Sequence, residues 1–253
     1  MDISVVIITK NEAHIIEKTL QSLAGLFDDI IIVDSGSDDH TVSICKSFHA
    51  NVIESTWEGY GKNKNKGITA ARYDWILSLD ADESIDEELM NSIKEISLLD
   101  DDLVFNIRFK NFFCNKWIRY GEWGFDSHLR LFNRRKVYWN DGAVHEKLIL
   151  PDHYKAITLK GHILHYTVQN QEDFIKKVYT YAHMNALKYY QAGKKGSSFK
   201  KFLSPLFSFV SNYFFKLGFL DGREGFTIAK YNAYYTYLKY HYLSEMNQKA
   251  PAK

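Results

Sequence analysis

The chain has 253 residues and is 45% hydrophobic, which is enough for one large globular domain or two small ones. Its formal net charge of +1 gives no reason to expect a nucleic-acid partner. The two cysteines, Cys45 and Cys114, lack the spacing of a zinc site and are too few for a disulfide framework. We expect no cleaved signal peptide, because the first residues do not form a basic region followed by an apolar one. We expect no membrane-spanning helix, because the sequence has no long apolar stretch without charges.

The first hundred residues alternate between two patterns. Apolar runs at residues 3–8, 30–33, 51–54 and 75–79 are typical of strands. Between them, residues 13–26, 41–48 and 68–73 favour helices. Strands that alternate with helices predict a parallel sheet with right-handed crossovers. The predicted fold class is therefore α/β, with a mostly parallel sheet flanked by helices.

Polar residues collect after three of these strands. The clusters are Thr9, Asn11 and Glu12; residues 34–41; and Asp80 with Asp82. The carboxyl ends of parallel strands meet at one edge of a sheet, where such folds bind ligands. Two aspartates one residue apart can share a hard cation, and that cation can hold a diphosphate. Residues 34–41 also fit a simple capped turn, which is the structural alternative.

A basic, glycine-containing segment covers residues 57–67. One interpretation is a flexible loop near the diphosphate, in which Lys62 or Lys64 offsets negative charge. The other is a solvated basic loop that precedes a helix.

The motifs of residues 7–12 (Ile-Ile-Thr-Lys-Asn-Glu), 33–41 (Val-Asp-Ser-Gly-Ser-Asp-Asp-His-Thr) and 79–83 (Leu-Asp-Ala-Asp-Glu) occur in this order. Together they resemble the family 2 glycosyltransferases, which have the Rossmann-like GT-A fold. The resemblance implies a nucleotide diphosphate sugar as donor and a divalent cation, Mg²⁺ or Mn²⁺, as cofactor. It implies that Thr9 and Glu12 line the nucleoside pocket and that Asp34 bonds to the base. Asp80 would lie near the ribose and the metal, and Asp82 would coordinate the metal. The other expected donor-binding residues are Asn11, Ser35, Gly36, Ser37, Asp39, Lys62, Lys64, Ala81 and Arg130.

The middle of the chain supplies the candidates for a catalytic base. Inverting glycosyl transfer needs a group that takes the proton of the acceptor hydroxyl. The pair His145-Glu146 fits this role, and Asp126 is the competing candidate. Arg130 suits an anchor for phosphate or carboxylate, although an ion pair with a neighbouring acid is equally plausible. The aromatic residues in 112–123 fit either stacking on sugars or core packing.

A narrower resemblance follows from residues 130–135 (Arg-Leu-Phe-Asn-Arg-Arg), the triplet Val-His-Glu at 144–146 and the segment 213–226. These resemble lipopolysaccharide core glycosyltransferases that add a β-linked hexose, usually glucose, to an inner-core heptose. The resemblance implies a uridine donor, a lipid-linked saccharide acceptor, and a cytoplasmic location on the inner face of the plasma membrane.

The C-terminal third combines helical spacing with aromatic and basic residues. Helical patterns cover residues 173–190, 199–217 and 226–245, and the second of these is amphipathic with flanking lysines. It fits a helix at the surface of an anionic membrane, or a helix packed on the protein's own core. The predicted domains are residues 1–190, with a nucleotide-sugar half (1–100) and an acceptor half (101–190), and a helical extension at 191–253.

Three rival functions stay open. The acceptor could belong to another surface polysaccharide or a polyprenyl carrier. A nucleotidyltransferase would share the paired acids. That class is expected to carry a Gly-rich, Arg-containing loop after the first strand, and residues 9–12 of this chain lack it. A nucleotide-sugar-binding protein without turnover would keep the same donor motifs.

Overall fold

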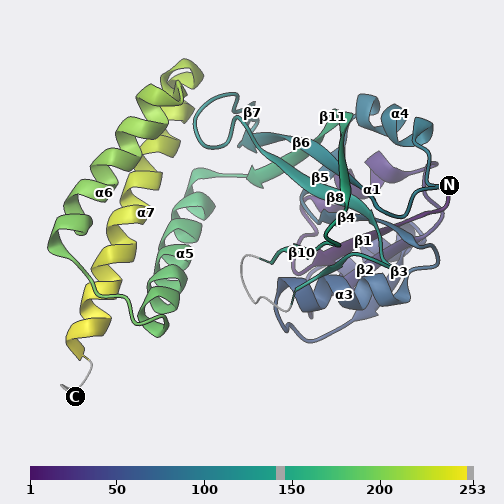
Figure 1. Cartoon of the computed structure of the whole chain (residues 1–253), viewed down its shortest axis with the longest axis horizontal. Helices are drawn as coiled ribbons and strands as arrows, with labels where there is room; N and C mark the ends of the chain where they lie inside the picture. Colours follow the sequence, from purple (N-terminus) through teal and green to yellow (C-terminus); the bar gives the residue numbers. More distant parts are fainter. Residues whose placement is uncertain (141–145, 250–253) are drawn as a thin grey trace. The chain divides into compact units, whose positions relative to one another are not determined.

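The computed structural model describes residues 1–140 and 146–249 (Figure 1). It divides into two compact units. Unit 1 comprises Met1–Phe109 and Ser127–His165, and unit 2 comprises Lys110–Asp126 and Tyr166–Lys253.

Unit 1 begins with four parallel strands in the order β3-β2-β1-β4. The strands are β1 (Ile3–Thr9), β2 (Ile30–Asp34), β3 (Asn51–Glu54) and β4 (Trp75–Asp80). They are joined by the helices α1 (Ile16–Leu23), α2 (Thr41–Ser47) and α3 (Tyr60–Ala70). Every residue of β1 is buried, as expected of a central strand covered on both faces.

The sheet continues beyond β4 with the order β8-β6-β11-β5, and the printed registers of β4 with β8, β8 with β6, and β11 with β5 are antiparallel. These strands are β5 (Glu83–Ile85), β6 (Leu103–Phe113), β8 (Ser127–Asn133) and β11 (Lys155–Val168). The short β7 (Lys116–Trp117) pairs with β6, while β9 (Tyr138–Trp139) and β10 (Leu148–Ile149) form a separate ribbon. Helix α4 (Glu87–Glu95) follows β5. The predicted α/β class, with helices flanking the sheet and a helical C-terminal part, is confirmed.

The core of unit 1 follows the two faces of β1, because successive side chains of a strand point to opposite sides. Ile3, Val5 and Ile7 pack in one cluster with Ile16, Leu20 and Leu23 of α1. Val6 belongs to a second cluster with Ile31, Ile68 and Ala71. The sheet is thereby held between helices on both sides.

The prediction of a loop over residues 57–67 is wrong for most of that segment, because α3 begins at Tyr60. The two glycines of this helix, Gly61 and Gly67, lie where neighbouring atoms leave no room for a side chain, and a Cβ atom on Gly61 would lie 1.9 Å from the carbonyl oxygen of Asn140. A Cβ atom on Gly67 would lie 2.4 Å from Val6 Cγ1 and 3.0 Å from Val33 Cγ2. Glycine at this position therefore lets α3 approach the sheet closely, and the approach buries Lys64.

Unit 2 contains α5 (Gln171–Gln191), α6 (Ser198–Val210), the π-helical turn η1 (Ser211–Phe215), the 3₁₀ turn η2 (Gly218–Asp221) and α7 (Gly222–Lys249). Helix α7 lies between α5 and α6 (Figure 1). In the core, the ring of Phe174 meets Phe113, Trp123 and Tyr231 edge-on. For Phe113 and Trp123 the structure therefore shows core packing.

The boundary of unit 2 differs from the predicted domain boundary at residue 190. Helix α5 packs along α7 over much of its length, so it groups with the C-terminal helices. Within the described residues, none of the helices combines the length and apolar character that crossing a membrane requires.

Candidate active site

The carboxyl ends of β1, β2 and β4 are neighbours in the sheet. The register pairs Thr9 with Asp34, and Ile8 with Asp80. The three polar clusters found in the sequence therefore meet at one edge of unit 1. Thr9 is buried, and its Oγ1 has no hydrogen-bond partner among the described residues. A buried hydroxyl without a partner is costly, so a ligand atom that bonds to it would stabilise this edge.

Asp34 closes the turn after β2. Its Oδ2 accepts hydrogen bonds from the backbone N–H groups of Gly36 (3.0 Å) and Ser37 (2.9 Å), and Oδ1 accepts from Ser37 Oγ (2.5 Å). Ser35 Oγ accepts from Asn63 Nδ2 of α3 at 2.9 Å. The capped turn considered as an alternative is present, and it fixes Asp34 at the strand end.

The loops after β1 and β2 are fastened together by backbone N–H groups that donate to side chains. These bonds run from Asn11 N to Ser37 Oγ (2.8 Å), from Glu12 N to Thr41 Oγ1 (2.8 Å) and from Ala13 N to Asp39 Oδ2 (3.1 Å). Asn11 itself has a left-handed backbone with φ of 56°. Asn11, Ser37 and Asp39 therefore shape the loops through hydrogen bonds inside the protein.

Lys64 is the centre of a buried charge cluster. It is only 1% exposed, and its Nζ lies 2.9 Å from Glu146 Oε1. The same Nζ lies 3.2 Å from Asp80 Oδ1, close enough for an ion pair but poorly aligned for a hydrogen bond. It also sits 4.6 Å from the centre of the Trp139 ring. Asn65, the next residue of α3, exchanges two hydrogen bonds with the backbone of Trp139. Helix α3 thus holds both the cation and the ring.

Arg130 forms a second link to Asp80. Its NH2 lies 2.6 Å from Glu83 Oε1 and 3.3 Å from Asp80 Oδ2. The other carboxylate oxygen of Glu83 accepts the backbone N–H of Asp80 at 2.9 Å. Of the two roles considered for Arg130, the structure shows the ion pair with neighbouring acids.

These cations set the protonation state of the cluster. Burial acts to raise the pKa of Asp80, but Lys64 and Arg130 outweigh it and hold that pKa below its ordinary range. Burial also acts to lower the pKa of Arg130, yet Glu83 and Asp80 raise it overall. Burial raises the pKa of Glu83, although Arg130 opposes this effect. Asp80 is therefore ionised and already neutralised by two cations.

Asp82 pairs with a residue from a distant part of the chain. His165 Nε2 lies 3.5 Å from Asp82 Oδ2, because the β11–β5 register places His165 opposite Glu83. Burial acts to lower the pKa of His165, but the Asp82 carboxylate outweighs it, so that pKa rises to about 9. Carboxylate oxygens are the ligands that Mn²⁺ and Mg²⁺ prefer, and the imidazole of His165 could join them only after it loses its proton. A divalent cation therefore fits the Asp82 carboxylate better than Asp80, whose oxygens face Lys64 and Arg130.

A pocket of about 440 Å³ adjoins the charge cluster. Its wall includes Arg130, Trp139, Glu146 and His128. Glu146 thus faces both Lys64 and the pocket, so a hydroxyl bound there would lie beside its carboxylate.

The remaining residues expected at the site differ in exposure, in hydrogen-bond partners or in the unit to which they belong. Lys62 is exposed on α3, whereas Lys64 is buried. Ala81 is buried, and its carbonyl accepts from Thr19 Oγ1 at 2.7 Å. Asp126 belongs to unit 2, where it accepts a 3.3 Å hydrogen bond from Asn111 Nδ2. His145 lies outside the described residues.

Three members of this site were not predicted from the sequence. Glu83 stands in the third motif, and its position directly after the paired aspartates was an available signal. His165 and Trp139 join the site through strand pairing and helix packing over long sequence distances, and no local pattern marks them.

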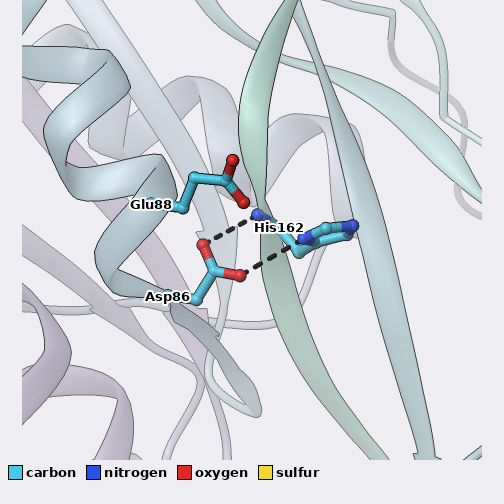
Figure 2. Close-up of side chains that lie close together, drawn as sticks. All are labelled: Asp86, Glu88 and His162. Atoms are coloured by element: carbon cyan, nitrogen blue, oxygen red, sulfur yellow. Dashed lines mark hydrogen bonds and ion pairs between the residues drawn. The ribbon is translucent and has the colours of Figure 1, made fainter.

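A second group of potential metal ligands lies on unit 1 and is shown in Figure 2. Asp86, Glu88 and His162 place ligand atoms within 4.8 Å of one another. Asp86 Oδ1 accepts from the N–H of Leu89 and of His162, both at 2.9 Å, and Oδ2 lies 3.2 Å from His162 Nδ1. Asp86 is thus the N-cap of α4 and a fastening between α4 and β11, which explains the cluster structurally.

Unit 1 combines parallel strands that end in carboxylates, an antiparallel continuation and a pocket with a charged wall, an arrangement that suits an enzyme acting on a polar substrate. Residues 4–156 match the model of "Glycosyl transferase family 2". An uncharacterized glycosyltransferase of Rickettsia bellii is 28% identical over 97% of this chain and 87% of its own. The lipopolysaccharide core biosynthesis glycosyltransferase LpsC of Rhizobium meliloti is 25% identical over 94% of this chain and 90% of its own.

Among solved structures, S. aureus TarS 1–349 in complex with UDP has a TM-score of 0.50 and 16% identity, over 98% of this chain and 92% of that one. This likeness supports the GT-A-like fold. The protein is a glycosyltransferase. Because the family model spans more than half of it, the chain belongs to glycosyl transferase family 2, and the predicted resemblance is confirmed.

Proposed function

We propose that this glycosyltransferase moves a hexose, with glucose as the first candidate, from a uridine diphosphate sugar to a lipid-linked saccharide with inversion. The proposed acceptor is the inner-core heptose of lipopolysaccharide, and the proposed place of action is the inner face of the plasma membrane. The observation that carries the proposal is the cluster of Asp80, Lys64 and Glu146 at the carboxyl ends of the parallel strands, beside the pocket.

The donor half of the proposal uses the edge where β1, β2 and β4 end. Thr9, with its unpartnered buried hydroxyl, and Asp34 would bind the nucleoside, as in the motif resemblance. The Asp82 carboxylate would hold Mn²⁺ or Mg²⁺, with His165 beside it, and the ion would supply positive charge next to the leaving diphosphate. TarS, a protein of similar fold, has been solved with UDP, which makes a uridine donor the first to test.

The protein's own residues would perform the proton transfer. The acceptor oxygen forms a bond to the anomeric carbon while the bond from that carbon to the diphosphate oxygen breaks. Glu146 takes the hydroxyl proton, and the nucleoside diphosphate leaves with the bonding electron pair. Lys64 holds Glu146 at 2.9 Å, so the base is oriented before the acceptor arrives. Asp126 is the alternative base.

The acceptor assignment rests on one named relative. LpsC of Rhizobium meliloti is a lipopolysaccharide core biosynthesis glycosyltransferase, and the alignment covers nearly all of both chains. The decisive experiment incubates the protein with membranes and a panel of radiolabelled nucleotide sugars, and then identifies the labelled lipid. Label in lipopolysaccharide supports the assignment, whereas label in polyprenyl carriers alone contradicts it.

The metal assignment has a separate test. Asp82→Ala is expected to lower the transfer rate by roughly 10²–10³-fold, because it removes a charge that orders the cation beside the leaving group. Asp152→Ala, which changes an exposed carboxylate of the same unit, is the matched control and should retain activity. Thermal unfolding of both variants checks that they are folded, and near-normal transfer by a folded Asp82→Ala would remove the assignment.

A further inference from the structure

Helix α6 presents its apolar side to solvent. Five exposed, large hydrophobic residues of this helix recur at helical spacing on one face, which we call the α6 face: Phe199 (72% exposed), Phe202 (66%), Leu203 (43%), Leu206 (59%) and Phe207 (68%). An amphipathic helix of a globular protein normally turns such a stripe toward the core. Because these five residues are exposed, they do not follow the alternative in which this stripe packs on the protein's own core.

The opposite side of α6, which faces α7, carries several polar residues. Lys201 Nζ lies 3.0 Å from His241 Nδ1 of α7 and 5.2 Å from the Tyr237 ring. Ser204 and Ser208 share this side by helical spacing and are half-buried. The helix is thus attached through polar as well as apolar groups, while the five apolar side chains of the α6 face are exposed.

The exposed apolar surface continues where the chain leaves α6. The turns η1 and η2 expose Phe214 (53%), Phe215 (74%), Phe219 (43%) and Leu220 (53%). Many exposed, large apolar side chains in one segment mark a surface that binds another protein or a membrane.

Charge narrows the choice of partner. Residues 174–220 contain eight lysines and no Asp, Glu or Arg, so this segment carries a net charge of +8. The whole chain carries +1, so the remaining residues carry −7. Lys194, Lys195, Lys200 and Lys216 are exposed near the α6 face and the following turns. A second copy of this chain would bring lysines against lysines, whereas an anionic lipid surface matches both the charge and the aromatic side chains.

We infer that the α6 face, with η1 and η2, is a docking surface for an anionic lipid bilayer, on which α6 lies in the plane of the headgroups. The aromatic and leucine side chains enter the boundary with the acyl chains, and the lysines remain among the anionic headgroups. The inference deepens the proposed function, on which it rests in one respect: a lipid-linked acceptor is found at such a surface.

The test is sedimentation of the whole protein with vesicles. We expect binding to vesicles of phosphatidylglycerol and phosphatidylcholine, little binding to phosphatidylcholine alone, and release by high salt. A variant with Phe199→Ser, Phe202→Ser and Phe207→Ser should bind anionic vesicles at least about tenfold more weakly, since it loses three aromatic side chains that would enter the bilayer. The control variant, Tyr181→Ser with Leu187→Ser, changes exposed residues of α5 and should bind as the unaltered protein does.

A second pair of variants separates the role of local charge from that of net charge. Lys195→Glu with Lys200→Glu should weaken binding strongly, whereas Lys46→Glu with Lys94→Glu changes the net charge equally in unit 1 and should not. Thermal unfolding confirms that every variant is folded.

Several outcomes would overturn the inference. The first is equal binding to neutral and anionic vesicles, and the second is unchanged binding by the triple serine variant. The third is a dimer in solution that the triple serine variant abolishes, because the α6 face would then bind a second copy of the chain. Failure of the proposed function is distinguishable. Without vesicles, the triple serine variant should still consume the nucleotide-sugar donor at the rate of the unaltered protein. Asp82→Ala should still bind vesicles.

Discussion

At the scale of single residues, the unusual feature is a lysine with almost no exposure that neutralises two carboxylates. Lys64→Met leaves Asp80 and Glu146 facing each other without their shared cation. Removing one partner of a fully buried ion pair costs about 3–5 kcal/mol, which is the upper limit for the loss in free energy of unfolding here, because Asp80 is partly exposed and keeps Arg130. Lys66→Met in the same helix is the matched control, because Lys66 pairs with the exposed Glu58 and should matter little. Urea titration measures both.

A double variant tests whether the loss comes from charge. Adding Asp80→Asn to Lys64→Met removes one of the two carboxylates that lose Lys64, so part of the lost stability should return. If the double variant is as unstable as the sum of the single changes, the contribution of Lys64 is packing against Trp139 and not electrostatic.

At the scale of helices and strands, α4 and β11 are joined by Asp86 (Figure 2). Asp86→Ala removes the N-cap of α4 and both bonds to His162, and loss of the cap alone costs about 0.5–2 kcal/mol. Asp86→Asn keeps a side-chain oxygen for the cap and loses the charged partner of His162, so it should be less destabilising. Urea unfolding ranks the two variants, and an equal loss would contradict the capping role. An increase in melting temperature on adding Zn²⁺ that Asp86→Ala abolishes would show a metal site instead.

The same scale shows what local patterns can and cannot predict. The strands β1, β2 and β4 were predicted because their short apolar runs can be recognised without information from the rest of the chain. The start of α3 was missed because its glycines and lysines suggest a loop. In the structure, Gly67 allows contact with Val6 and Val33, and Lys64 finds partners 16 and 82 residues away along the sequence.

The orientation of α6 was open for a related reason. Helical spacing predicted an apolar stripe, but the direction in which the stripe faces depends on α7, where Lys201 meets His241. The position of His165 next to Asp82 likewise comes from pairing of β11 with β5. Tertiary partners therefore decided both features, and periodicity alone carries no information about them.

At the scale of the whole molecule, the two proposed ligands belong to different units. The proposed donor-binding edge lies in unit 1, while the α6 face and the segment with eight lysines lie in unit 2. Hydrogen exchange can read both at once, because a ligand that binds the folded state suppresses local opening of the elements it contacts. A uridine diphosphate sugar with Mn²⁺ should slow exchange in the loops after β1, β2 and β4. Anionic vesicles should slow exchange in residues 198–221, and neutral vesicles should not.

The two effects should also be separable by mutation. Asp82→Ala should remove the protection that the donor gives in unit 1 and leave the protection by vesicles in unit 2, because it takes away the proposed metal ligand and no proposed lipid contact. The triple serine variant of α6 should do the reverse. If vesicles instead protected the strand ends of unit 1 and left residues 198–221 unchanged, the lipid would be binding at the donor edge, and the α6 face would need another partner to explain its exposed aromatic residues.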